Sequence, residues 1–120
     1  MQKEYEPEYI EIVLERLQTE HYLDDLVLAQ TFVENRQRLK PRSTRQLNAE
    51  LHKKGISKEV IEEVLSEIDQ EDQLLTIKEI TEKKIKQAKY QDPQKMTQYL
   101  VRQGFKYSDI KLVLEESSLL

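Results

Sequence analysis

Positive charge is concentrated in one short part of this sequence, residues 36–54. This stretch holds seven lysine and arginine side chains and a single acid, Glu50, for a net charge of +6. Cations at this density can neutralise nucleic-acid phosphates and release their counterions, or they can complement an acidic groove on a protein. A charged helix surface that meets only water is the third possibility. The stretch is therefore the first candidate for a binding site.

The charge of the remaining chain alternates along the sequence. Residues 1–35 have a net charge of −7 and residues 55–72 a net charge of −6, whereas residues 73–90 reach +3 and residues 91–120 balance to zero. The overall net charge of −4 therefore hides a strong segregation. Such alternation indicates separate charged faces rather than one uniform polyelectrolyte.

Residue combinations that carry catalysis or hold a metal are not found in the sequence. His21 and His52 are isolated, without a second ligand at the three- or four-residue spacing of the usual kind. The acidic pairs at 62–63 and 115–116 are typical of solvated helix surfaces, and there is neither a cysteine nor a glycine-rich phosphate loop. We therefore expect a protein that is not an enzyme and that uses no cofactor and no metal.

The composition favours long helices in a protein that stays in solution. Among 120 residues there are only two glycines, three prolines and 7% aromatic residues, which suits helices better than a sandwich or a barrel. No apolar run approaches the roughly 20 residues that span a bilayer, and the acidic N-terminus lacks a signal-peptide core. We expect a cytoplasmic monomer without membrane contact.

Apolar residues at helical spacing predict a series of amphipathic helices. The expected helices cover 8–18, 24–39 with Asp24 as N-cap, 43–54, a stretch that begins at Ser57, 71–89, 92–104, and 108–116 with Ser108 as N-cap. Their expected apolar stripes include Ile10, Val13, Leu14 and Leu17, then Leu28, Ala29, Phe32 and Val33, and later Leu74, Ile77, Ile80, Ile85 and Ala88.

The helix that starts after Ser43 carries its start and stop signals in the sequence. Ser43 is a natural N-cap, and Gln46 three residues later completes a capping-box pattern. Gly55 stands where a helix ends through a left-handed residue, which glycine adopts without a Cβ clash. Leu51 and Ile56 then occupy the two positions that touch in a Schellman ending. Local chemistry alone predicts this helix.

The second half of the chain repeats this pattern. At an offset of 49 residues, Leu47, Leu51, Gly55, Ile61, Val64 and Leu65 match Met96, Leu100, Gly104, Ile110, Val113 and Leu114. The only two glycines are thus equivalent, and Phe105 follows one as Ile56 follows the other. Residues 28–32 match 76–80 at an offset of 48, and the stripe of the first helix matches residues 61–68 at an offset of 51.

A period near 50 residues with three helices per unit is typical of arrays in which each unit buries its apolar face on its neighbours. We expect an all-α fold of tandem three-helix repeats that form an elongated, curved helical array. Residues 1–20 would be the last helix of a truncated first repeat, 21–69 the second repeat and 70–120 the third. Because the sequence begins within a repeat, we expect it to be the C-terminal portion of a longer protein.

Several motifs occur in a fixed order from about Ile10 onward. They are Leu23-Asp24-Asp25, Ala29-x-x-Phe32-Val33-x-x-Arg36, Lys40-Pro41-Arg42-Ser43-x-Arg45-Gln46-Leu47-x-x-Glu50-Leu51, Lys54-Gly55-Ile56, and Tyr99-Leu100-Val101-Arg102-x-Gly104-Phe105-x-Tyr107-x-x-Ile110. In this order and spacing the sequence resembles the RecX family of bacterial RecA regulators. It departs from the family pattern in two places: the first repeat is nearly absent, and Lys106 stands where a serine cap is common.

The resemblance implies a non-enzymatic regulator in recombination, DNA repair and the SOS response. Family members bind within the groove of the RecA–single-stranded DNA filament and suppress strand exchange, ATP hydrolysis and co-protease activity. Two other interpretations stay open. One is a sequence-independent module that binds single- or double-stranded DNA without RecA. The other is an inert structural fragment whose active portion belonged to the missing first repeat.

Helical angles separate outward cations from those beside an apolar stripe. We expect contacts to a RecA filament or to DNA phosphates from Arg38, Lys40, Arg42, Arg45 and Lys53, with Lys83, Lys86 and Arg102 in support. Arg36 and its equivalent Lys84 lie beside their stripes, so we expect Arg36 to be structural and to pair with a carboxylate or to cap a helix end. The other residues expected to be structural are Leu47, Leu51, Gly55, Ile56, Leu100, Gly104 and Phe105.

The second half of the chain repeats the apolar residues and the glycine of the helix at 43–54, but not all of its positive charges. At the offset of 49, Arg45 corresponds to Gln94 and Lys53 to Arg102, and Arg42 has no basic counterpart. We therefore expect function to depend on these cations. Reversal of Arg42, Arg45 and Lys53 to glutamate is predicted to weaken inhibition of strand exchange while leaving thermal unfolding nearly unchanged.

Overall fold

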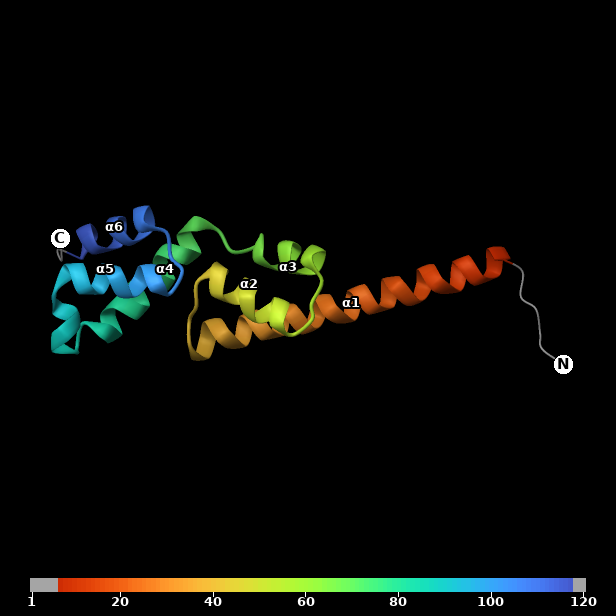
Figure 1. Ribbon diagram of the computed structural model, residues 1–120, viewed down its shortest axis with the longest axis horizontal. Coiled ribbons are helices and arrows are strands. Elements are labelled where there is room, and N and C mark those ends of the chain that lie inside the picture. Colours follow the sequence, from red (N-terminus) through yellow and green to blue (C-terminus); the bar gives the residue numbers. More distant parts are fainter. Residues whose placement is uncertain (1–6, 118–120) are drawn as a thin grey trace.

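The computed structural model describes residues 7–117, and helices are the only regular elements within that range. Their order is α1 Pro7–Leu39, α2 Thr44–Lys53, α3 Lys58–Leu65, α4 Gln70–Lys84, the 3-10 helix η1 Ala88–Gln91, α5 Pro93–Arg102 and α6 Tyr107–Glu116. The Cα atoms extend over 75 × 21 × 19 Å. α1 forms one end of this rod and α4 to α6 form the other (Figure 1). The expected elongated, all-α fold is confirmed.

α1 is one continuous helix of 33 residues. The prediction of two helices here, the second capped by Asp24, is wrong. Neither glycine nor proline lies between the two expected helices, so no residue there forces the backbone out of the helical conformation. Side-chain contacts between residues four apart also bridge the expected boundary: Arg16 Nε lies 3.5 Å from Glu20 Oε1, and His21 Nε2 lies 3.4 Å from Asp25 Oδ2.

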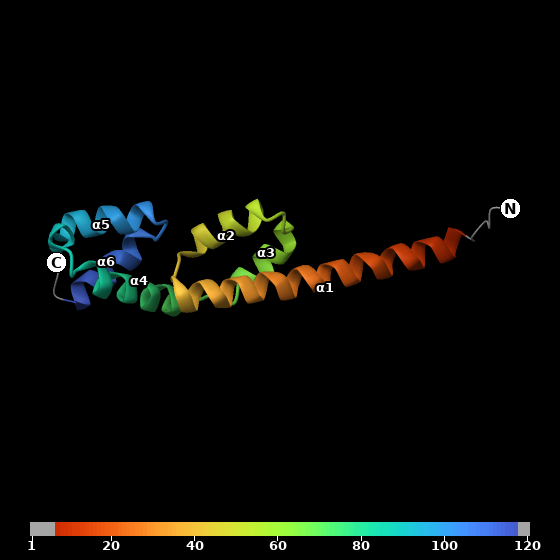
Figure 2. The same ribbon diagram turned by 90° about the horizontal axis from the view of Figure 1, so that it is seen from below.

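The first packed unit consists of the C-terminal half of α1 together with α2 and α3 (Figures 1 and 2). Its core is a cluster of buried apolar side chains: Ala29, Val33, Leu47, Leu51, Ile56, Val60, Ile61 and Val64. Leu28 was expected in this stripe, but 56% of its surface is exposed. The stripe instead runs through Tyr22, Leu26, Ala29 and Val33, whose spacing of four, three and four residues follows one helix face.

Serine side chains begin α2 and α3, as expected. Ser43 Oγ accepts a hydrogen bond of 3.1 Å from the Gln46 backbone N–H, and Ser57 Oγ accepts one of 3.4 Å from Val60. The capping-box expectation for Gln46 is wrong, because its side chain does not return to Ser43. The Gln46 amide donates instead to Gln103 Oε1 at 2.9 Å, in the other half of the molecule.

Both glycines end a helix in the left-handed conformation. Gly55 has a φ of 83° and Gly104 a φ of 97°. After α2, Ile56 N–H donates to the Leu51 carbonyl at 3.1 Å and Gly55 N–H to the His52 carbonyl at 3.0 Å. After α5, the equivalent bond joins Phe105 N–H to the Leu100 carbonyl at 3.2 Å. The two bonds after α2 are those of a Schellman ending, so this prediction is confirmed.

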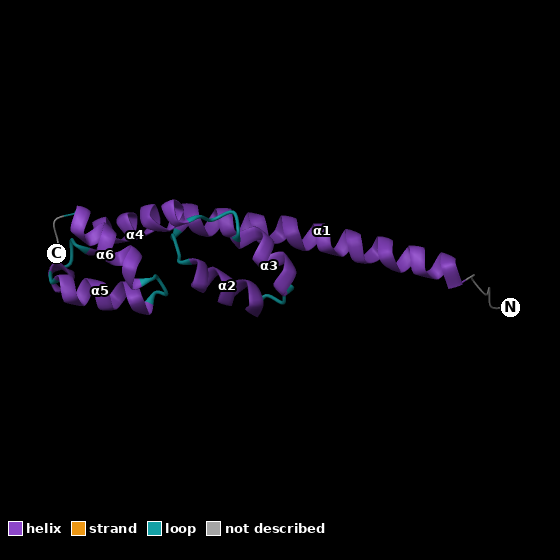
Figure 3. Cartoon of the chain, turned by 90° about the horizontal axis from the view of Figure 1, so that it is seen from above, coloured by secondary structure: helices purple, strands orange, loops and turns teal. Residues whose placement is uncertain are grey.

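The second packed unit consists of α4, η1, α5 and α6 (Figure 3). Its core is a second cluster of buried apolar side chains: Ile77, Met96, Leu100, Phe105, Ile110, Val113 and Leu114. The polar side of α4 is joined to α6, because Gln70 Nε2 donates to the buried Asp109 Oδ1 at 3.0 Å. Each unit therefore has its own core, while the division at residues 1–20, 21–69 and 70–120 stays a prediction.

Two helix boundaries in the second unit differ from expectation. α4 ends at Lys84 rather than near Lys89, and the residues that follow form a turn and the short η1. α6 begins at Tyr107 after Lys106, which occupies the N-cap position without a side-chain cap, so the expected cap at Ser108 is wrong. Asp92 caps α5 as expected, with a hydrogen bond of 2.9 Å from Gln94 N–H.

The N-terminal half of α1 extends beyond both packed units (Figures 1 and 2). Its apolar stripe is exposed, with exposed fractions of 45% for Ile10, 37% for Val13, 52% for Leu14 and 56% for Leu17. The residues that match this stripe in and just after α3, by contrast, belong to the first core or pack against it. The stripe is therefore helical and apolar, as predicted, but no described residue covers it.

Candidate partner-binding surface

Seven of the eight cations predicted to bind a partner have exposed side chains. They are Arg38, Lys40, Arg45, Lys53, Lys83, Lys86 and Arg102. Exposure agrees with the outward direction that helical angles gave for those on helices, and it leaves their charges open to a partner. Binding by these side chains stays a prediction.

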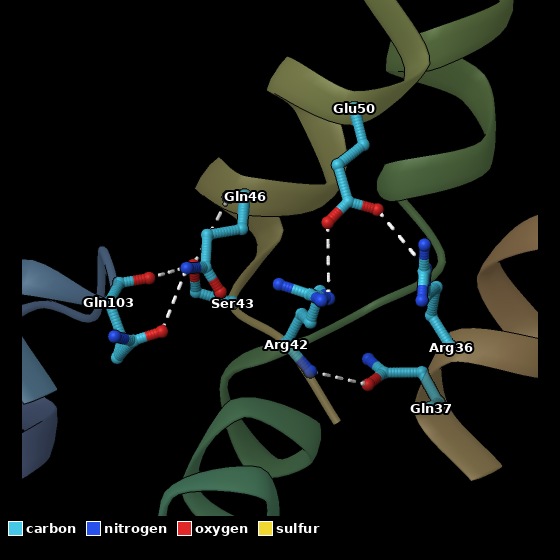
Figure 4. A network of polar contacts seen from close by, with 7 residues as sticks. All are labelled: Arg36, Gln37, Arg42, Ser43, Gln46, Glu50 and Gln103. Atoms are coloured by element: carbon cyan, nitrogen blue, oxygen red, sulfur yellow. Dashed lines mark hydrogen bonds and ion pairs between the residues drawn. The ribbon is translucent and has the colours of Figure 1, made fainter. Parts of the chain in front are cut away.

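Arg42, the eighth cation, is engaged within the protein. Only 20% of its side chain is exposed, and its Nε lies 3.1 Å from Glu50 Oε1. The other oxygen of the same carboxylate, Oε2, lies 3.2 Å from Arg36 Nε. Figure 4 shows both guanidinium groups directed at Glu50 on α2, one from α1 and one from the loop between the two helices. One carboxylate thus holds three parts of the chain together.

Arg36 pairs with a carboxylate, as expected from its place beside the apolar stripe. Its guanidinium also lies over the Phe32 ring, with 5.2 Å between Cζ and the ring centroid, and Lys54 Nζ lies 5.0 Å from the same centroid. Its equivalent Lys84 contacts two aromatic rings instead: Lys84 Nζ lies 4.8 Å from the Tyr99 centroid and 5.5 Å from the Tyr90 centroid. Cation–π contacts of this kind stabilise by about 0.5–2 kcal/mol.

The two packed units meet through polar side chains. Ser43 Oγ, which is fully buried, donates to the Gln103 carbonyl at 2.6 Å while it caps α2. Gln46 Nε2 donates to Gln103 Oε1, and Thr44 N–H donates to Gln73 Oε1 at 3.2 Å. Figure 4 shows Ser43 and Gln46 turned toward Gln103. The N-terminus of α2 is therefore fixed to the C-terminal end of α5.

Gly104 allows this approach. A Cβ at Gly104 would lie 2.8 Å from Ser43 Oγ and 3.1 Å from Arg45 Cβ, which is too close for an unstrained contact. Arg45 therefore lies against the second unit with its stem, although its side chain is exposed. It also lines a wide hollow of about 1010 Å³ between the units, together with Lys106 and the acids Glu62, Asp69 and Asp109.

On another side of the same junction, three of the predicted cations meet in one pocket of about 140 Å³. Its charged lining residues come from both units: Lys40, Arg42, Lys83 and Lys84, with Glu79 as the carboxylate. We call this the cation pocket. Its other lining residues are Leu39, Pro41, Gln46, Ile80, Tyr99 and Gln103. Sequence reasoning missed Lys84 as a member, although its equivalence to Arg36 marked it as a cation near the packed surface.

Comparison with known proteins places the chain in a family. A sequence model described as the second three-helix domain of RecX matches residues 24–65. The chain is also 36% identical to the regulatory protein RecX of Prosthecochloris aestuarii over 112 residues, which cover 93% of this chain and 74% of that protein. The chain belongs to the RecX family. The predicted resemblance is thereby confirmed.

Other RecX proteins are longer than this chain. It is 32% identical to the regulatory protein RecX of Geobacillus thermodenitrificans over 91% of its own length but only 42% of that protein. For the regulatory protein RecX of Clostridioides difficile the identity is 29%, over 97% of this chain and 57% of that protein. The comparison with solved structures gave no match. This RecX chain thus spans about three quarters of one relative and roughly half of the others.

The described residues contain neither a membrane-spanning helix nor a metal-binding cluster. Within residues 7–117, no helix is both long and apolar enough to cross a membrane. In the same range, no group of three or more histidine, aspartate or glutamate side chains is arranged to hold a metal ion.

Proposed function

We propose that this RecX chain binds the RecA–single-stranded DNA filament and inhibits its recombinase, ATPase and co-protease activities by occupying its groove. Membership of the RecX family carries this proposal, because the family resemblance implies that partner and that outcome. The contacts would come mainly from Arg38, Lys40, Arg42, Arg45 and Lys53, with support from Lys83, Lys86 and Arg102.

The shape and charge of the molecule support groove binding. A rod of 75 × 21 × 19 Å offers a long, narrow surface that can follow a groove over several filament subunits. The exposed cations occur in both packed units, so both can contribute to attraction toward a filament that carries DNA phosphates. Inhibition then needs no chemistry, because a groove filled by the rod is closed to a second DNA strand.

A sequence-independent DNA-binding module that acts without RecA is the alternative function. The cation pocket favours it, since four cations from both units and only one acid line it. The two functions differ in partner and in salt dependence. Binding to DNA alone should weaken steeply as salt rises, and capture on DNA should not require RecA.

Because Arg42 pairs with Glu50, it is a poor choice for the variant that tests the proposal. Glutamate in place of Arg42 would lie beside Glu50, where two like charges repel, so this reversal would alter stability as well as binding. Arg45 and Lys53 are better targets because both side chains are exposed and neither forms an ion pair with a described residue. Glutamate at position 45 also suits the first turn of α2, which carries no acid.

The experiment compares two double variants with equal charge changes in a RecA ATPase assay on single-stranded DNA. We expect Arg45→Glu with Lys53→Glu to raise the half-inhibitory concentration at least tenfold. Lys78→Glu with Lys95→Glu, which alters exposed cations outside the proposed contact set, should change it less than threefold. Equal inhibition by both double variants would contradict the assigned contacts. Lack of inhibition by the unaltered chain would contradict the proposed function itself.

A further inference from the structure

Most of the positive charge of the cation pocket is not compensated within the protein. None of Lys40, Lys83 and Lys84 forms an ion pair with a residue in the part of the chain that the structure describes. Arg42 uses Nε for its pair with Glu50, and its two terminal nitrogens make no hydrogen bond to residues 7–117. The pocket therefore holds donors and charge beyond what the fold requires.

The walls of the pocket come from both packed units and are fixed relative to each other. Gln46 and Gln103 line it, and the hydrogen bond of 2.9 Å between their side chains joins the units at this point. Ser43 is held by the Gln103 carbonyl in the same region (Figure 4). Because the loop cations and the α4 cations face one space only while this junction is closed, the pocket is a preorganised site.

The size and chemistry of the pocket match a phosphate group. A volume of about 140 Å³ has room for one tetrahedral oxyanion. Lysine ammonium groups and the arginine guanidinium are hydrogen-bond donors that suit the oxygens of a phosphate. Apolar residues Leu39, Pro41 and Ile80 line the same pocket and offer a surface for a sugar.

We propose that the cation pocket binds one backbone phosphate of single-stranded DNA, and this inference rests on the proposed function. A planar side-chain carboxylate of a protein partner offers two acceptor oxygens and fits the arrangement less well than a phosphate does. Bound DNA would contact both packed units at once. It would thereby lock the junction through which the rod keeps its shape.

The test measures binding of a fluorescent oligothymidine by anisotropy, without RecA, over a series of salt concentrations. We expect Lys40→Gln with Lys83→Gln to weaken binding about tenfold at low salt. The slope of log K against log salt should fall in magnitude by about 0.7, the value for one lost contact to a single-strand phosphate. Lys78→Gln with Lys95→Gln removes the same charge from exposed positions outside the pocket and should change binding less than threefold.

Competition experiments then identify the ligand. Inorganic phosphate in the millimolar range should displace the oligothymidine only partly, because it lacks the sugar and the neighbouring phosphates. An oligoglutamate peptide that displaces it as well as unlabelled oligothymidine does would overturn the assignment in favour of an acidic protein. Equal binding of the oligothymidine by the two glutamine double variants would overturn the assignment of the pocket as a phosphate site. This outcome does not depend on RecA, which is absent from the binding assay. Failure of the unaltered chain to inhibit RecA ATPase would remove the proposed function instead.

Discussion

The two packed units share backbone features at equivalent positions but differ in what surrounds them. Gly55 and Gly104 both end a helix with positive φ, at 83° and 97°. A Cβ at Gly55 would meet no atom within 4 Å, whereas a Cβ at Gly104 would meet Ser43 and Arg45 of the other unit. Gly55 is thus needed only for the backbone conformation of its turn, whereas Gly104 is also needed for the close contact between the units.

A second pair of equivalent positions shows the same divergence. At the offsets of 48 and 49, Arg36 and Glu50 correspond to Lys84 and Tyr99. In the first unit the two positions form an ion pair, and in the second they form a cation–π contact. The repeated pattern therefore specifies which positions contact each other. The type of interaction at these positions differs between the two units, and cations without a carboxylate partner remain at the junction.

The largest effect on stability is expected from substitution of Gly104, with Gly55 as its matched control. Alanine at either position must adopt positive φ, which costs about 1 kcal/mol. Gly104→Ala also forces a methyl group against Ser43 Oγ at 2.8 Å, and overpacking of this kind adds about 1–3 kcal/mol. Urea unfolding should therefore show a loss of about 2–4 kcal/mol for Gly104→Ala and about 1 kcal/mol for Gly55→Ala. Equal losses would show that the close approach at Gly104 does not contribute.

A smaller effect is expected from the two capping serines. Ser57→Ala removes one cap, which stabilises by about 1 kcal/mol. Ser43→Ala removes a cap and also the hydrogen bond to the Gln103 carbonyl, a buried contact that adds about 1 kcal/mol. Thermal unfolding should rank Ser43→Ala below Ser57→Ala by a few degrees. The reverse order would contradict the assigned contact between the units.

The smallest effect is expected from loss of the cation–π contact of Tyr99, and a larger one from loss of the equivalent ion pair of Glu50. Glu50→Gln leaves two guanidinium groups without their carboxylate, so we expect a loss of about 1–2 kcal/mol that shrinks in 1 M salt. Tyr99→Leu keeps an apolar side chain but loses the contact to Lys84, for about 0.5–1 kcal/mol. Chemical unfolding at two salt concentrations measures both losses. A Glu50→Gln loss that does not respond to salt would argue against an electrostatic role.

Much of the fold followed from the sequence because its signals are local. Ser43, Ser57 and Asp92 cap helices, and the two glycines end them, through contacts within one turn of the chain. Where a start signal is not preceded by a residue that ends a helix, the sequence misled. Asp24 has the chemistry of an N-cap but lies within α1, because no residue near it forces the chain to leave the helix.

The candidate surface was predictable only in part, for a related reason. Helical angles place side chains such as Arg45 and Lys53 correctly, since they depend only on position within one helix. Arg42 lies in the loop before α2, where no helical angle applies, so its pair with Glu50 could not be foreseen. The cation pocket needs residues from two units, and the sequence does not say how those units meet.

The most direct test of the central claim is electron cryomicroscopy of RecA–single-stranded DNA filaments saturated with this chain. We predict continuous helical density for a rod about 75 Å long within the filament groove, with its junction toward the DNA. Filaments whose groove remains empty at saturating concentrations of the chain would contradict the account.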